Sequence, residues 1–136
     1  MHFNAYSHNA GLLAAALANV DDEANADAVE NLLAEHWVAR ARLTDRQLDA
    51  LRSWRVRLWE VFDAAEMRDK LSIVNGLLRE SVSRPYISTH DGHAPHLHYV
   101  DEDADVVARV KAVTAAGIAY VLTASDPECA PGSRVK

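Results

Sequence analysis

The sequence has 136 residues, of which 49% are hydrophobic and 25% are charged. These values are typical of one soluble globular domain and exclude a largely disordered chain. The net charge of −6 repels a phosphate backbone, so nucleic-acid binding would require a locally basic module. A single cysteine excludes a disulfide framework, and we find no signal-peptide pattern, so we expect a cytoplasmic protein without a membrane partner.

Five helices are predicted from composition and from the spacing of apolar residues. The chain has 24 alanines but five glycines and four prolines, which favours helices over a turn-rich barrel. A capping box from Thr44 to Gln47 marks the start of the third helix, and Pro85 ends the fourth. The fifth helix is apolar nearly all round in its last two turns, so we expect that end to be buried. The predicted helices span about residues 11–20, 27–40, 45–65, 66–83 and 104–124.

A β-hairpin is predicted between the fourth and fifth helices. Two β-prone runs, at residues 86–90 and 96–100, flank the turn signal Asp91-Gly92. A two-stranded hairpin is marginally stable alone, so we expect it to dock on the helices. The predicted fold class is therefore mainly α (α+β), with about five helices and one hairpin inserted before the last.

The seam between hairpin and helices is the predicted site for a small molecule. Polar and aromatic groups at such edges are typical of ligand pockets. Asn75 lies among apolar helical neighbours, where a buried amide needs a hydrogen-bond partner. The candidate ligand-binding residues are Asn4, Tyr6, Asn75, Tyr86, His90, His96, His98 and Tyr99.

Two hairpin histidines are a second candidate site. His96 and His98 are two residues apart, so on a strand they share a face and could bind one metal, with His90, Asp91 or His93 as further ligands. The structural alternative is a pair of half-exposed hairpin residues.

The other distinctive side chains indicate structural roles. The third helix carries arginines that we expect to pair with nearby acids on a solvated face. These are Arg46, Arg52, Arg55 and Arg57. Trp37, Trp54 and Trp59 are expected to pack in or around the core. The motifs of phosphate loops and serine nucleophiles are missing, so the sequence gives little support to an enzyme.

Four segments resemble a known family. They are Phe3-Asn4-Ala5-Tyr6, residues 71–78 (LSIVNGLL), residues 84–92 (RPYISTHDG) and residues 95–99 (PHLHY). Together with the Ala/Val-rich last helix, they resemble the N-terminal ABATE domain of actinobacterial CGNR zinc-finger proteins, which are regarded as stress-induced transcription regulators. The resemblance implies a sensor or interaction domain over residues 1–126 and a tail, 127–136, where the family's zinc finger would begin.

The family's finger needs several cysteines, whereas this sequence has Cys129 alone. Zinc and DNA are therefore expected only with an intact C-terminal finger, and no cofactor is expected in this chain. We predict a sensor or interaction domain of a transcription regulator, which binds a small-molecule effector between hairpin and helices. The alternatives are a small metal-binding protein or enzyme that uses the hairpin histidines, and a homodimer that pairs hairpin edges.

Overall fold

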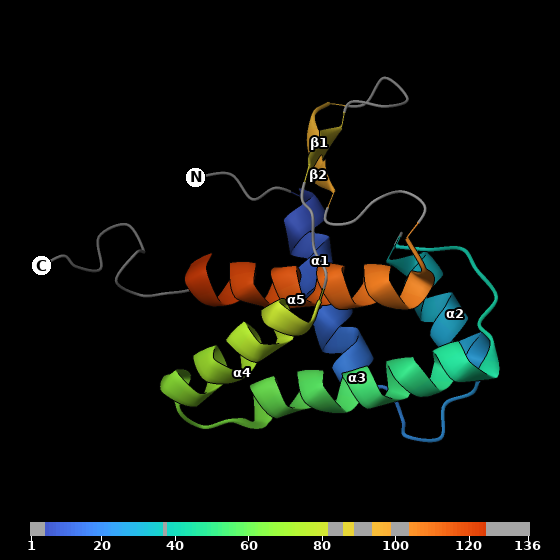
Figure 1. Cartoon of the computed structure of the whole chain (residues 1–136), viewed down its shortest axis with the longest axis horizontal. Helices are drawn as coiled ribbons and strands as arrows, with labels where there is room; N and C mark the ends of the chain where they lie inside the picture. The colour runs from blue at the N-terminus through green and yellow to red at the C-terminus, as the bar shows by residue number, and fades with distance from the viewer. Residues whose placement is uncertain (1–4, 37, 82–85, 89–93, 99–103, 125–136) are drawn as a thin grey trace, which may run out of the picture.

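The described residues of the computed structural model form five α-helices and one two-stranded antiparallel sheet (Figure 1). The structure describes residues 5–36, 38–81, 86–88, 94–98 and 104–124, and side chains in all of these except 5–7, 88 and 96–98. The elements are α1 (Ala5–Ala18), α2 (Ala26–Glu35), α3 (Asp45–Asp63), α4 (Met67–Glu80), β1 (Tyr86–Ser88), β2 (His96–His98) and α5 (Val106–Ala124). This confirms the predicted fold class.

The hydrophobic core lies among the helices. α1 crosses α5 and also packs on α3, while α4 contacts both α3 and α5 (Figure 1). α2 packs against α1 and α3. The largest fully buried side chains are Trp54, Leu13, Leu17, Leu33, Leu51, Leu58, Leu77, Val29, Val61, Val110 and Thr114.

Two helix boundaries differ from the sequence prediction. α1 begins at Ala5, six residues before the predicted start, because its first turns carry few apolar residues and periodicity does not reveal them. α2 ends at Glu35 rather than near residue 40. His36 closes it, since its backbone N–H and its ring Nδ1 both contact Leu32 O, and the chain then leaves the helix.

The predicted start of α3 is confirmed. Thr44 Oγ1 accepts a hydrogen bond from the Gln47 backbone N–H at 3.1 Å, and Gln47 Oε1 accepts one from the Thr44 N–H at 2.9 Å. The helix then buries one face at helical spacing, as predicted. The capping box therefore satisfies two of the backbone donors at this end of the helix within the chain.

Thr44→Ala is expected to lower the free energy of unfolding by about 1 kcal/mol, because the N-cap acceptor is lost. Thr44→Ser, which keeps the hydroxyl, is the matched control and should stay close to wild type. Urea denaturation followed by circular dichroism measures both. Equal stability of Thr44→Ala and wild type would contradict a contribution from this cap.

The hairpin is formed, but its strands do not dock as expected. Tyr86 pairs with His98, Ile87 with Leu97 and Ser88 with His96. The described strands project away from the helices (Figure 1), and the Ile87 side chain is 72% exposed. The expectation of a hairpin packed on the helical body is therefore wrong for these strands. The predicted turn at Asp91-Gly92 lies outside the described residues.

α5 is the central helix of the core. It has the length and hydropathy of a membrane-spanning helix, and it also packs against α1, α3 and α4. Its buried residues run from Val106 to Ile118, whereas Val121 is 40% exposed. The expectation that its last two turns are buried is thus wrong for the final turn, which borders a cavity instead.

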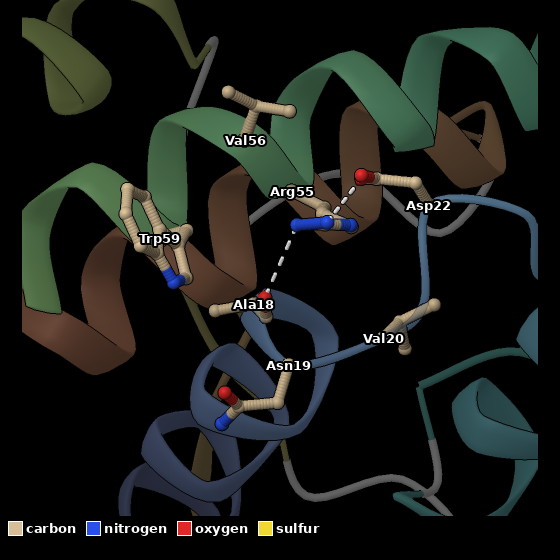
Figure 2. A pocket seen from close by; sticks show the side chains of 7 residues that line it. All are labelled: Ala18, Asn19, Val20, Asp22, Arg55, Val56 and Trp59. Carbon is tan, nitrogen blue, oxygen red and sulfur yellow. Dashed lines mark hydrogen bonds and ion pairs between the residues drawn. The ribbon is translucent and has the colours of Figure 1, made fainter. Parts of the chain in front are cut away.

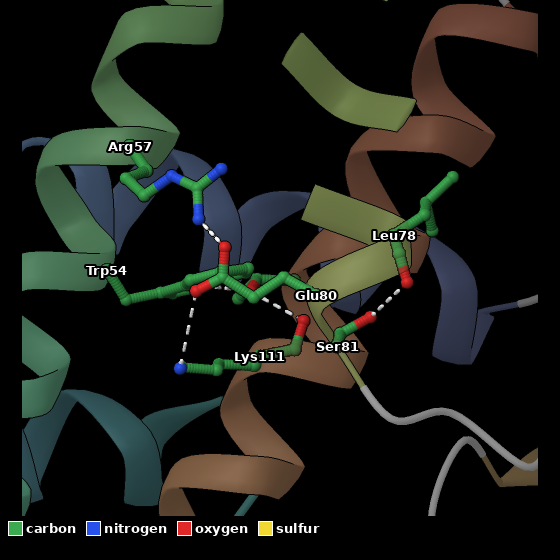
Figure 3. A network of polar contacts seen from close by, with 7 residues as sticks. Trp54, Arg57, Leu78, Glu80, Ser81 and Lys111 are labelled. Carbon is green, nitrogen blue, oxygen red and sulfur yellow. Dashed lines mark hydrogen bonds and ion pairs between the residues drawn. The ribbon is translucent and has the colours of Figure 1, made fainter. Parts of the chain in front are cut away.

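Ion pairs and a tryptophan join three helices on another side of the core (Figure 3). Glu80, at the end of α4, pairs with Arg57 of α3 and, at 3.7 Å, with Lys111 of α5. Both cations lie over the Trp54 ring, with Arg57 Cζ at 5.6 Å and Lys111 Nζ at 5.2 Å from its centroid. The cation–π contacts and the shared carboxylate hold the three helices together.

Candidate functional site

Of the predicted ligand-binding residues, the structure describes the side chains of Asn75 and Tyr86 alone. Asn75 lies on the exposed side of α4, so its amide reaches solvent and needs no partner from a ligand; the expectation of burial is wrong. Tyr86 lies in the projecting hairpin, half-buried. Tyr6 lies in α1 and His96 and His98 lie in β2, but their side chains are not described. Asn4, His90 and Tyr99 lie outside the described residues.

The hairpin register bears on the predicted metal ligands at the level of the backbone. Positions 96 and 98 are two apart on a formed strand, opposite Ser88 and Tyr86 respectively, and therefore share a face. In the part of the chain that the structure describes, no three His, Cys, Asp or Glu residues gather as a metal site. Because the two imidazoles are outside that part, metal binding by the hairpin stays a prediction.

A cavity of about 500 Å³ lies beside the place where α1 crosses α5. We call it the crossing cavity. Its walls also include the end of α3 and the first turn of α4, which lie with the C-terminal end of α5 on the same side of α1 (Figure 1). The residues that line it are His8, Gly11, Leu12, Ala15, Val61, Phe62, Lys70, Ile118, Val121, Leu122 and Ala124.

Two glycines set the geometry of this crossing. A Cβ added to Gly117 of α5 would lie 2.5 Å from the backbone carbon of Ala10, and one added to Gly11 of α1 would lie 2.7 Å from Val121 Cγ2. The two helices therefore meet backbone to backbone, which only glycine permits. The cavity opens beside this contact, and Gly11 and Val121 both line it.

The walls of the crossing cavity are mainly apolar and partly open to solvent. Leu12 is 49% exposed, Phe62 47% and Val121 40%, although all three are large hydrophobic side chains. Such a cluster at the mouth of a cavity marks a binding surface more often than a solvated one. An apolar molecule seated here would remove this surface from water, which is the main driving force for binding.

Lys70 is the one lysine or arginine among these lining residues. Its Nζ donates to Val61 O at 2.8 Å and to Phe62 O at 3.2 Å, the last carbonyls of α3. The ammonium is placed there because a helix C-terminus attracts a cation. None of the lining residues is acidic. The cavity thus combines an apolar wall with a positioned positive charge.

A second, more open cavity of about 420 Å³ lies where α1 ends against α3 (Figure 2). Arg55 spans it and donates to Ala18 O at 3.3 Å while pairing with Asp22. Its guanidinium is already neutralised by that carboxylate and capped by that carbonyl. The Arg55–Asp22 ion pair therefore belongs to the wall of this cavity and offers no unpaired charge to a ligand.

The prediction of a solvated arginine face is wrong for Arg55 of α3, whose side chain is only 13% exposed. Arg52 is 38% exposed and pairs with Asp49 at 3.8 Å, as predicted, and its Nη2 also donates to Ala24 O at 2.6 Å. Both side chains hold the α1–α2 connection, and the Nε atoms of both are buried without a partner. Of the tryptophans, Trp54 is buried and Trp59 is 46% exposed at the rim, as expected of packing residues, while Trp37 lies outside the description.

Sequence reasoning did not identify the crossing cavity. The one available signal was the apolar C-terminal end of α5, which was assigned to the core. The local sequence around Lys70 does not indicate its role, because its carbonyl partners belong to the preceding helix. Gly11 and Gly117 are 106 positions apart, and nothing in either local sequence predicts that they meet.

No protein-family profile matches the chain, and no curated protein matches it either.

Proposed function

We propose that this chain is a sensor domain of a transcription regulator and that its small-molecule effector binds in the crossing cavity. The regulator role rests on the resemblance of residues 71–99 to the ABATE domain. We place the effector site among the helices rather than at the hairpin, because the described strands project away from the body, whereas the helices enclose a cavity. DNA binding would come from a zinc finger, which Cys129 alone does not provide.

The observation that carries the proposal is the crossing cavity itself. Its volume of about 500 Å³ is within the usual range of small-molecule sites, and its lining is mainly apolar with few polar groups. Four helices contribute to the wall, so a ligand in it contacts α1, α3, α4 and α5 at once. Binding would then stabilise one arrangement of these helices, which is what a sensor requires.

The cavity can be tested by filling it from within. Ala15→Phe places an aromatic ring against the cavity from the α1 wall, where Ala15 is half-buried. We expect the wild-type chain to bind the neutral fluorescent probe N-phenyl-1-naphthylamine at one site, and Ala15→Phe to weaken this binding about tenfold or more, since the probe loses its space. Fluorescence titration measures the affinity.

Ala28→Phe is the matched control, because it adds the same ring to an exposed position of α2 outside the cavity. It should bind the probe as wild type does. The proposal is refuted if the wild-type chain does not bind the probe saturably, or if Ala15→Phe and Ala28→Phe bind it equally well.

A further inference from the structure

We infer that the ligand of the crossing cavity is an amphipathic monocarboxylate, with its hydrophobic body against α1 and α5 and its carboxylate on Lys70. This inference rests on the proposed function, and it adds the chemical class of the effector. It is carried by the position of one ammonium group in a wall whose other side chains, apart from His8, are apolar.

The geometry of Lys70 leaves it able to bind an anion. An ammonium group has three N–H donors, and two of them are used by Val61 O and Phe62 O. These two bonds fix Nζ at the end of α3 and leave the third donor for a ligand oxygen. No ion pair joins Lys70 to a carboxylate within the described part of the chain, so its charge is not neutralised there.

The charges of the other lining residues determine which ligand charge the cavity favours. The described lining contains no Asp or Glu, so a carboxylate placed against Lys70 meets no like charge. A cationic ligand would instead face Lys70 across an apolar cavity, where a buried like-charge pair is strongly unfavourable. A neutral ligand would fit the apolar wall but would gain nothing from the ammonium.

The shape and chemistry of the rest of the wall select the body of the ligand. Leu12, Ile118 and Val121 present aliphatic surface, and Gly11 and Ala15 leave the space between them open. These groups offer few hydrogen bonds, so a sugar or a nucleotide would lose its hydration without replacement. A hydrocarbon chain or ring with one terminal carboxylate can contact the aliphatic wall and bind the Lys70 ammonium at the same time.

The test compares two probes of equal length and different charge. Decanoate is ionised at neutral pH, and 1-decanol has the same chain with a neutral head. Both are used to displace N-phenyl-1-naphthylamine from the wild-type chain. We expect decanoate to bind about tenfold more tightly than 1-decanol, as one charge-assisted hydrogen bond to a partly buried ammonium would provide.

Lys70→Met keeps the length and apolar stem of the side chain but removes the charge, and Lys70→Arg keeps the charge. We expect Lys70→Met to abolish the preference for decanoate while leaving 1-decanol binding unchanged, and Lys70→Arg to retain most of the preference. Binding of 1-decanol by Lys70→Met also shows that this variant has kept the cavity, although it has lost the bonds to α3.

The outcomes separate the inference from the proposed function. If wild type and Lys70→Met bind both probes with equal affinity, the cavity binds ligands but the charge assignment is wrong. If decylammonium displaces the neutral probe better than decanoate does, the inferred negative charge of the ligand is wrong. If the wild-type chain binds N-phenyl-1-naphthylamine but neither decanoate nor 1-decanol displaces it, the assigned ligand class is wrong while the cavity remains a binding site. If the wild-type chain does not bind N-phenyl-1-naphthylamine, the proposed function fails together with the inference.

Discussion

Replacing Gly117 by alanine is expected to lower the free energy of unfolding by about 2–3 kcal/mol, the usual cost of overpacking a rigid interior. The added Cβ would lie 2.5 Å from the Ala10 carbonyl carbon, 2.7 Å from its oxygen and 2.7 Å from the Gly11 nitrogen. All three atoms belong to the backbone of α1, so the steric clash can be removed only if the whole helix moves. Urea denaturation measures the loss.

Two further glycines form a graded control series. In Gly11→Ala the new Cβ meets Val121 Cγ2 at 2.7 Å, and this exposed side chain can rotate away, so we expect a smaller loss. In Gly76→Ala the nearest atom is Arg57 Nη2 at 3.9 Å, and the helical interior should gain about 0.5–1 kcal/mol. Equal effects at Gly117 and Gly76 would contradict the close crossing.

The crossing also links stability to binding. Moving α1 away from α5 changes the wall of the crossing cavity, to which both helices contribute. Gly117→Ala should therefore weaken binding of the neutral probe as well as lower stability, whereas Gly76→Ala should leave binding unchanged. Comparing probe binding by Gly117→Ala and Gly76→Ala therefore distinguishes a site formed by the helix crossing from a nonspecific apolar surface.

Trp54→Ala is expected to destabilise the chain by about 3–5 kcal/mol, the range for removing a large buried aromatic side chain. Trp54 is 1% exposed at the centre of α3, and its indole Nε1 donates to Thr114 Oγ1 at 2.8 Å. Thr114 in turn donates to Val110 O at 2.6 Å. The loss combines a cavity in the core with an acceptor that is left without its indole donor.

Milder substitutions isolate the hydrogen bond. Thr114→Val should cost about 1–3 kcal/mol, because it leaves the indole N–H buried without an acceptor. Trp54→Phe removes that donor, so Thr114→Val should be less costly in the Trp54→Phe background. A double-mutant cycle from thermal or urea unfolding measures the coupling. Strict additivity of the two substitutions would show that the bond contributes nothing.

The sequence predicted those elements whose cause is local. The start of α3 was predictable because Thr44 and Gln47 satisfy each other's backbone donors over three residues. Its buried face was predictable because Leu51, Trp54 and Leu58 repeat at helical spacing. The hairpin strands were predictable from β-prone residues around a turn signal. Each of these signals is contained within a few consecutive residues.

The predicted site depended on how these elements pack, and there two expectations were wrong: the burial of Asn75 and the docking of the hairpin strands. Asn75 has apolar neighbours in sequence, but its position on α4 faces solvent. The hairpin forms, but its described strands project from the helical body, and the Ile87 side chain is 72% exposed. Local patterns say which residues are apolar, but they do not say which faces find a partner.

The five helices, the hairpin and most of the core follow from local sequence signals, because helical periodicity, caps and turn residues act over short distances. The position of the crossing cavity follows instead from the packing of distant segments. Gly11 and Gly117 meet through long-range packing, and Lys70 reaches carbonyls of another helix. The cavity is a consequence of how helices cross, and that depends on the sum of many distant contacts rather than on any local pattern.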